Sequence, residues 1–408
     1  MKINNIIKQK ALPSFCTANF DVIESIFYFC NLNKLPCLIE CTSNQVNQYG
    51  GYSNHSPKTF IKEVNNLRKK IKLKQSQLFL GGDHLGPLPW KNSSNKIAQS
   101  NSINLINKFL NEKFDKIHID TSIKCKNDKF INSEIIFSRT FKILNSLNIK
   151  KKIKNKFLII GTEVPLSGSG DNKNIIVTNF KQIKTESLKF IKFLNDQNFK
   201  EKKFGLVVEP GMKYMNYSIK KPLFKTFFKK REFSKENNFV YEAHSTDYQP
   251  KKILDKLVDN NFKFLKVGPE LTYNYSRALF FMNSIEKKLF KKTESYIKKN
   301  ILLSMIQNKK YWQDYYSDRN DHLLLNSKLD RSRYYLNTKN VKNSINILKR
   351  NINQLDKHRF LSLIQRDLRK DFLFYNKKNL SNFDNIKLIF ISKTLKRYFK
   401  ACRFMNIE

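Results

Sequence analysis

Short apolar runs that end in a charged residue or a glycine recur along the first 270 residues of this chain. Examples are CLIECTS, LFLGGDH, FLIIGTEVP, FVYEAHS and FLKVGPE. Each run has the length and composition of a buried β-strand, and nearly all carry a carboxylate, histidine or lysine near the downstream end. The pattern predicts eight strands, namely Leu12–Asn19, Cys37–Ser43, Leu78–His84, Lys116–Ser122, Phe157–Val164, Phe204–Gly211, Phe239–Ser245 and Phe264–Glu270.

Helical patterns fill the gaps between these runs. Pro57–Leu73 has a clear start, with Ser56 as N-cap and proline at the first helical position. Strands that alternate with helices indicate parallel pairing through right-handed crossovers, and eight repeats favour closure. We therefore expect an α/β fold, a (β/α)8 TIM barrel with a C-terminal helical extension. The other predicted helices are Asp21–Asn31, Asn101–Phe114, Asn132–Lys150, Phe180–Asn198, Lys251–Asn261 and Thr272–Phe290.

The barrel is expected to span residues 10–290, and residues 291–408 to form the extension, packed on the barrel or on a partner. After Glu270 the sequence contains neither glycine nor proline, and apolar residues recur at helical spacing, as in Val341–Leu348. The basic stretch 212–238 is interpreted as an irregular insertion before the seventh strand. Neither GxxxxGK[ST] nor GxGxxG occurs, which weakens the alternative of an open nucleotide-binding sheet.

The charge balance alone would suggest a nucleic-acid partner. Lys and Arg number 77 against 34 Asp and Glu, a formal net charge of +43. The excess is spread over the whole chain, however, and the abundance of Lys, Asn, Ile and Phe is the bias expected from an AT-rich genome. No zinc knuckle or RNP-like motif is present. We expect a solvated basic surface that attracts anionic ligands, and no nucleic-acid partner.

The six cysteines show no CxxC pair and no disulfide framework. Cys16, Cys37 and Cys41 lie in apolar runs, where a free cysteine behaves as a small hydrophobe. No signal peptide is evident, and no apolar run approaches the ~20 residues that a membrane span needs. We expect a cytoplasmic protein with no membrane association.

Ionisable residues collect at the downstream ends of the predicted strands. Taken singly, each is more often a structural residue. Taken together they favour a polar cavity, because a buried charge must be paired or ligated and barrel sites lie at this edge. His118 shares a strand face with Asp120. The candidate catalytic residues are Glu40, Asp83, Asp120, Glu163, Glu242 and Lys266.

Within this set, His84, His244 and Glu163, with Asp83, have the nitrogen and oxygen ligands of a Zn²⁺ or Mn²⁺ site. Lys266 could form a Schiff base with a ketose, but an ion pair with a rim carboxylate is favoured. Hydroxyls and amides of residues 167–170 offer another anion site or form a plain loop. The candidate residues for binding the substrate or its phosphate are Asn44, Gln45, Ser245, Thr246, Asp247 and Gly268.

Several long segments resemble one known family. They are IECTSNQVNQYGGY (39–52), LGGDHLGPLPW (80–90), IGTEVP (160–165), YEAHSTDYQ (241–249), LKVGPELT (265–272) and KKYWQDYY (309–316). In this order they are similar to the GatZ/KbaZ family, the accessory subunit of class II D-tagatose-1,6-bisphosphate aldolase. The chain departs from the family in its high charge, in Cys41 and in the basic 212–238 segment.

The resemblance implies a (β/α)8 protein that is not itself catalytic. It would support the activity and stability of a separate metal-dependent class II aldolase subunit in galactitol, N-acetylgalactosamine and tagatose catabolism. The implied partners are that subunit and a ketose (bis)phosphate, in a hetero- or homo-oligomer. Some members of the family resemble ketose-phosphate 4-epimerases, which interconvert tagatose 6-phosphate and fructose 6-phosphate. That alternative would use the strand-end groups directly.

Overall fold

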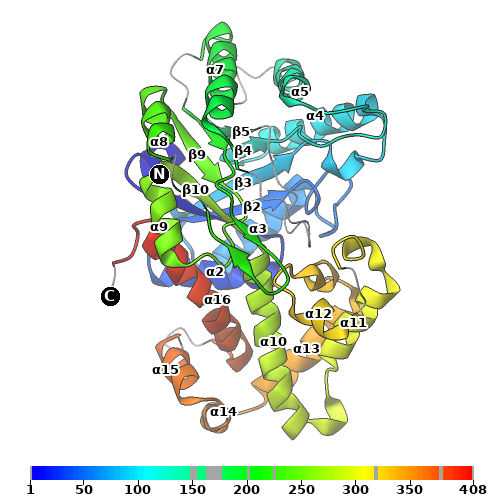
Figure 1. Ribbon diagram of the computed structural model, residues 1–408. Helices are drawn as coiled ribbons and strands as arrows, with labels where there is room; N and C mark the ends of the chain where they lie inside the picture. The colour runs from blue at the N-terminus through cyan, green and yellow to red at the C-terminus, as the bar shows by residue number, and fades with distance from the viewer. Residues whose placement is uncertain are drawn as a thin grey trace.

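The protein is described by a computed structural model, which covers residues 2–147, 153, 155–161, 177–199, 203–222, 224, 227–316, 320–375 and 380–406. Eight parallel strands form a closed barrel in the order β1-β10-β9-β6-β5-β4-β3-β2. The predicted (β/α)8 fold with C-terminal helices is confirmed (Figure 1). The barrel strands are β1 (Leu12–Cys16), β2 (Cys37–Thr42), β3 (Leu78–Leu85), β4 (Lys116–Ile119), β5 (Phe157–Ile160), β6 (Phe204–Val207), β9 (Phe239–Ala243) and β10 (Phe262–Val267).

The base of the barrel interior is apolar. Leu12, Leu38, Phe79, Val240 and Phe264 belong to one buried cluster there. The short helix α1 (Ile3–Ile7), which the sequence patterns did not reveal, contributes its isoleucines to the same cluster. Because side chains alternate between the two faces of a strand, the residue two positions further on enters the interior one layer higher. That next layer holds the charged groups.

In the described part of the chain, seven helices that each come after one of the first seven barrel strands in sequence cover most of the outside of the barrel (Figure 1). The space between the first and last of them, α2 and α9, is taken by α16, the helix at the C-terminal end. It packs on α2, α9, α10 and β1. The helices are α2 (Phe20–Leu32), α3 (Pro57–Ile71), α4 (Asn95–Asn111), α5 (Ser133–Ser146), α7 (Phe180–Asp196), α8 (Phe227–Glu236), α9 (Lys251–Asp259) and α16 (Asn382–Ala401).

Helix α10 (Pro269–Leu289) follows the last strand, runs along α16 and leads away from the barrel into the extension (Figure 1). It packs on α11 and α13, so the extension is joined to the barrel through α10 and α16. The division of the chain at residue 290 stays a prediction. The remaining elements are α11 (Ile297–Gln307), α12 (Asp321–Asn326), α13 (Lys339–Asn353), α14 (Lys357–Leu363), α15 (Arg366–Tyr375) and the 3-10 turns η1 (Gln75–Gln77), η2 (Leu88–Trp90), η3 (Lys291–Thr293), η4 (Lys309–Tyr311) and η5 (Arg331–Tyr335).

The basic 212–238 segment is not an irregular insertion over the residues that are described. It contains a small antiparallel hairpin, β7 (Lys213–Tyr214) with β8 (Ile219–Lys220), and then α8. The buried positions on α8 include Phe227, Lys230 and Ser234, at helical spacing. Only the first of these three is apolar, so the sequence shows no hydrophobic stripe. Lys230 is tolerated inside because its ammonium group donates to the Thr178 carbonyl.

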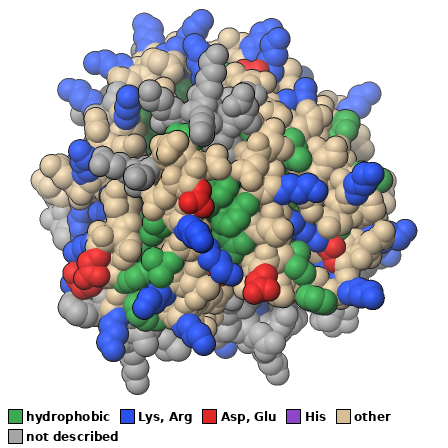
Figure 2. Space-filling view, turned by 90° about the horizontal axis from the view of Figure 1, so that it is seen from above, with side chains coloured by type: hydrophobic (Ala, Val, Ile, Leu, Met, Phe, Trp, Pro, Cys, Tyr) green, Lys and Arg blue, Asp and Glu red, His purple; other side chains and the backbone are tan. Residues whose placement is uncertain are grey.

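On the face seen in Figure 2, the positive charge is scattered. Figure 2 shows Lys and Arg side chains distributed over one face, with acidic and apolar groups between them, rather than gathered in a stripe. Among the described residues, no helix combines the length and apolar character of a membrane span.

We expect Lys387 on α16 to be critical for stability. This lysine is 1% exposed, and its Nζ lies 2.6 Å from Glu24 Oε2 and 3.2 Å from Asp21 Oδ1 on α2. Removing one partner of a buried ion pair leaves the other charges uncompensated. Lys387→Met should lower the free energy of unfolding by about 3 kcal/mol in denaturant titrations. Lys393→Met, at an exposed position of the same helix, is the control, and an equal loss in both variants would contradict the prediction.

Candidate functional site

A layer of paired charges lies directly above the apolar base of the barrel. Glu40, Glu242 and Lys266 each stand two positions after a residue of that base, on β2, β9 and β10. Lys116, at the start of β4, is fully buried between two of them, with Nζ 2.6 Å from Glu40 Oε1 and 2.5 Å from Glu242 Oε2. Gly81 on β3 leaves space for the Glu40 side chain, since a Cβ at position 81 would lie 2.8 Å from Glu40 Cγ.

Asp83 and His84 both reach this site although they are consecutive in β3. The β3–β4 ladder is irregular between Gly82 and Leu85, and His84 has a φ of 46°, in the left-handed region. The irregularity breaks the usual alternation of side chains. Gly86 then passes so close to the Asp120 carbonyl oxygen that a Cβ would lie 1.6 Å from it. Glycine at this position therefore lets the loop after β3 sit against the end of β4.

Lys266 joins the two carboxylate layers. Its ammonium group forms a close ion pair with Asp83 and lies 3.5 Å from Glu40 Oε2 and 3.7 Å from Glu242 Oε1. Burial lowers the pKa of Lys266, but the carboxylates of Asp83, Glu242 and Glu40 raise it well above the ordinary value overall. Lys266 is thus a protonated, ion-paired lysine in this state, as the sequence analysis favoured over a Schiff base.

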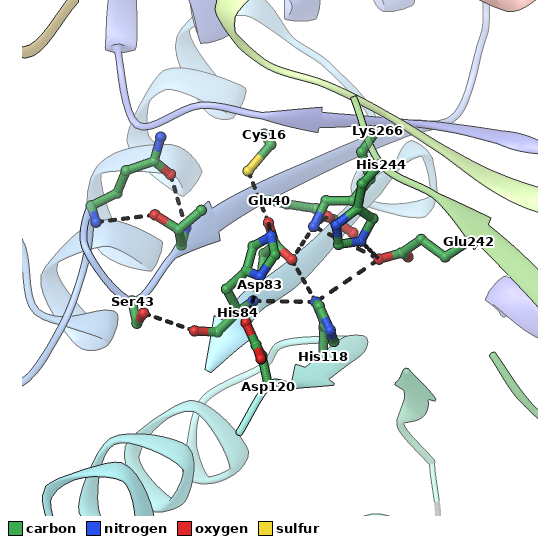
Figure 3. A network of polar contacts seen from close by, with 12 residues as sticks. Cys16, Glu40, Ser43, Asp83, His84, His118, Asp120, Glu242, His244 and Lys266 are labelled. Carbon is green, nitrogen blue, oxygen red and sulfur yellow. Dashed lines mark hydrogen bonds and ion pairs between the residues drawn. The ribbon is translucent and has the colours of Figure 1, made fainter. Parts of the chain in front are cut away.

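Three histidines face one another beside the lysine (Figure 3). His84 Nδ1 lies 2.9 Å from Asp120 Oδ2, so it carries the proton, since an ionised carboxylate only accepts. Asp120 is fixed in turn by the backbone and hydroxyl donors of Ser122, at 2.9 and 2.6 Å. His118 Nδ1 lies 2.8 Å from Asp83 Oδ1, and His244 Nε2 lies 3.0 Å from Glu242 Oε1.

Burial and neighbouring charge divide these groups into neutral and ionised ones. Burial, with Lys266 close by, lowers the pKa of His244 to about 3, and burial also lowers that of His118. Burial would raise the pKa of Asp83, but His84, Lys266 and His118 bring it well below its usual range. Glu40 is the exception, because burial raises its pKa despite Lys116 and Lys266. Neutral imidazoles beside ionised carboxylates are the form that binds metal.

The donor set fits a divalent cation. One ligand atom each from Asp83, His84, His118 and His244 lies within 4.8 Å of the others. His118 Nε2 is buried and forms no hydrogen bond with the described residues. The Asp120–His84 contact leaves His84 Nε2 for coordination, in the manner of a carboxylate–histidine–metal relay. Four carboxylates here face two lysines, so the cluster has an excess of negative charge that a cation would offset.

Comparison with known proteins identifies the group to which the chain is related. The family described as D-tagatose-1,6-bisphosphate aldolase subunit GatZ/KbaZ-like matches residues 2–403. The chain belongs to this family. The D-tagatose-1,6-bisphosphate aldolase subunit GatZ of Escherichia coli O1:K1 / APEC is 31% identical over 380 residues, covering 88% of each chain.

Two further matches span comparable lengths. The subunit GatZ of Escherichia coli O9:H4 (strain HS) is 31% identical over 381 residues, again with 88% of each chain covered. A crystal structure described as a probable tagatose 6 phosphate kinase from Sinorhizobium meliloti 1021 is 26% identical, with a TM-score of 0.82. That match covers 96% of this chain and 100% of the other, so it includes the extension as well as the barrel.

In this GatZ/KbaZ-like chain the structure brings most of the predicted site residues together, although their roles stay predictions. Glu163, proposed both as a catalytic residue and as a metal ligand, and residues 167–170 lie outside the described part of the chain. Asn44 and Gln45 lie on the loop after β2, where the Gln45 carboxamide oxygen accepts from the Thr42 backbone amide. The predicted residues that meet in the cluster are Glu40, Asp83, His84, Asp120, Glu242, His244 and Lys266.

The predicted phosphate-binding groups after β9 and β10 are largely engaged with the protein itself. The Thr246 hydroxyl lies 2.5 Å from the Lys266 carbonyl oxygen and 2.7 Å from the Tyr398 hydroxyl on α16. Asp247 Oδ1 accepts from the amides of Gly268 and Glu270, at 3.0 and 2.8 Å. A carboxylate of the protein thus occupies the start of α10, where an anion would otherwise be stabilised. Ser245, with a φ of 53°, lies at the turn before them.

Sequence reasoning did not assign a role to Lys116 or Cys16. Lys116, His118 and Asp120 lie at alternate positions of one strand run, and this period of two was the signal that could have placed the lysine inside. Cys16 was interpreted as a small hydrophobe, but it is half-buried at the end of β1 and its thiol lies 3.2 Å from Asp83 Oδ2. An apolar run gives no local signal that separates a cysteine near a polar site from one that only packs in the hydrophobic core.

The Asp247 cap generates a pH-dependent prediction. Burial, with Glu270 nearby, raises the pKa of Asp247 to about 7, so the folded state binds a proton more tightly than the unfolded chain. The resulting contribution to stability is present below about pH 4 and is lost as the pH rises through about 7. Asp247→Asn keeps an acceptor for both amides and cannot ionise. Between pH 5 and 8 its free energy of unfolding should rise relative to wild type by about 2 to 4 kcal/mol, whereas a constant difference would refute the assignment.

Proposed function

We propose that this protein is the GatZ/KbaZ-type accessory subunit of a class II tagatose-1,6-bisphosphate aldolase. It would bind a separate catalytic aldolase subunit, support the activity and stability of that subunit, and act in galactitol, N-acetylgalactosamine or tagatose catabolism. The main support for this proposal is the family match over residues 2–403. Relatives that bear the name of this subunit also align with the chain over 88% of both sequences.

The breadth of the match matters for this proposal. It extends through the helices beyond residue 290 and is not confined to a barrel shared by many unrelated enzymes. The relatives and the Sinorhizobium structure are both named after phosphorylated tagatose. A ketose phosphate is therefore the ligand class that the comparisons support best.

Association with the catalytic subunit is directly testable. Co-expressed with a class II aldolase subunit from the same cell, the tagged chain should retain that subunit through affinity purification and gel filtration. The half-time of aldolase inactivation on heating should lengthen several-fold, because binding to the folded state stabilises it by mass action. An unrelated (β/α)8 protein at the same concentration serves as the control, and absence of a complex with unchanged inactivation would reject the proposal.

One observation favours a second function, a metal-dependent ketose-phosphate 4-epimerase. A purely supportive subunit has no need for three histidines and several buried carboxylates around one point. Zn²⁺ or Mn²⁺ held by Asp83, His84, His118 and His244 would polarise a ketose carbonyl. Glu40, whose pKa burial raises, is suited to carry a proton, and Lys266 holds the surrounding carboxylates in place.

Metal binding and turnover test the second function. Purified protein dialysed against Zn²⁺ or Mn²⁺ should retain a stoichiometric amount of the ion. His244→Ala should reduce metal binding and abolish conversion of tagatose 6-phosphate to fructose 6-phosphate. His358→Ala, at an exposed position of α14, should leave both unchanged. Metal retention without turnover would remove the epimerase but keep the metal site, and loss of neither property in His244→Ala would remove both.

A further inference from the structure

The extension reaches over the open end of the barrel. Tyr334, in η5, packs its ring 4.8 Å from that of Tyr52, on the loop after β2. Just before η5, the Lys328 carbonyl oxygen accepts from the Tyr248 hydroxyl, on the loop after β9, at 2.8 Å. Tyr248 in turn packs on Tyr214, after β6, at 5.6 Å between ring centroids. Since β2 and β6 lie four places apart in the ring of eight, this segment of the extension spans the mouth.

Arg333 lies within this span, in η5. Its Nη1 donates to the carbonyls of Leu329 and Asp330, both at 2.7 Å, and its Nη2 donates to the Tyr334 hydroxyl at 3.0 Å. Among the described residues, no carboxylate oxygen lies within ion-pair distance of this guanidinium. The Asp330 carboxylate is instead engaged by the hydroxyls of Thr272 and Ser332. The two carbonyl groups and the Tyr334 hydroxyl therefore fix the orientation of Arg333.

Two arginines act on the phenol of Tyr334 in this span. Burial would raise the pKa of the Tyr334 phenol, but Arg333 and Arg331 lower it below its ordinary value. Tyr334, Arg333 and Tyr52 each remain partly exposed, so an anion can approach them.

Tyr52 lies between the extension and the acidic cluster. Burial and Tyr334 raise the pKa of its phenol, and Arg333 and Cys16 lie near enough to influence that pKa as well. Cys16 contacts Asp83, and His84 beside it is 17% exposed in its side chain. Arg333, Tyr52, Cys16 and Asp83 thus form a series that leads from the extension to the candidate cation ligands, with a positive charge at the first residue and a negative charge at the last. A sugar phosphate has an anionic end that suits Arg333 and a neutral end whose hydroxyl groups can donate to carboxylates.

We propose that Arg333, with the hydroxyls of Tyr334 and Tyr52, binds the phosphate of a ketose phosphate whose sugar carbons lie toward Asp83 and Lys266. Planar guanidinium groups and hydroxyl donors are well matched to phosphate oxygens. The excess of carboxylates in the cluster repels a phosphate, so the anionic end is held at the extension. The choice of a ketose as the sugar rests on the proposed function, while the anion site rests on the geometry of η5. The helical extension would thereby complete the ligand site of the barrel.

The test is calorimetric titration of the full-length protein with tagatose 6-phosphate, inorganic phosphate and unphosphorylated tagatose. Wild type should bind tagatose 6-phosphate more tightly than tagatose. Arg333→Gln should weaken the binding of tagatose 6-phosphate and of inorganic phosphate about tenfold or more, and should leave tagatose unchanged. Arg333→Lys should recover part of the loss. Arg350→Gln, which removes one positive charge from an exposed position of α13, should bind like wild type.

Tyr52→Phe guards against a folding artefact, because it removes a single hydroxyl and should weaken phosphate binding with an unchanged melting temperature. Equal affinities of wild type and Arg333→Gln, or no binding of either phosphate compound by wild type, would overturn the site. Co-purification of Arg333→Gln with the aldolase subunit is measured in parallel. A retained complex with lost phosphate binding supports the site, and a lost complex with wild-type phosphate binding overturns it.

Discussion

Lys116 forms ion pairs with two glutamates inside a closed barrel, and the candidate site depends on this interaction. Without it, Glu40 and Glu242 would face each other as buried charges of the same sign, at a high cost in solvation. Because Lys116 is present, the apolar base of the barrel interior can be followed directly by a layer of charged side chains. Lys266 extends the same pairing upward to Asp83, so the carboxylate nearest to the histidines is already fixed in position.

The C-terminal helix is coupled to this site through strand β10. Arg397 on α16 pairs with Glu270 at the start of α10, and Tyr398 contacts the Thr246 hydroxyl, which lies against the Lys266 carbonyl. A helix that ends seven residues before the C-terminus of the chain therefore stabilises the backbone that carries the central lysine. The extension lies between β10 and α16 in sequence, so its folding and the completion of the barrel wall are physically connected.

Local sequence patterns were sufficient to predict a strand or helix where the buried positions and the periodicity of apolar residues agreed. The strand runs around Cys37–Thr42 and Leu78–Leu85 were recognisable because apolar residues ended in polar tips, and helix α3 because Ser56 caps it before a proline. Helix α8 escaped recognition because Lys230 and Ser234 occupy buried positions that are usually apolar. The role of α16 in the barrel wall could not be predicted, since its neighbours α2 and α9 are remote in sequence and helical periodicity does not specify a partner.

The sequence by itself determined that strands alternate with helices and that acids, histidines and a lysine stand at the strand ends, because residue type and period are local properties. Only the tertiary structure decided which of these groups meet. Closure of the sheet brought Lys116 to Glu242, the irregularity in β3 turned both Asp83 and His84 inward, and Asp247 was directed to the start of α10. Each of these contacts joins residues whose distance depends on strand register and loop path, and neither quantity is encoded at a single position.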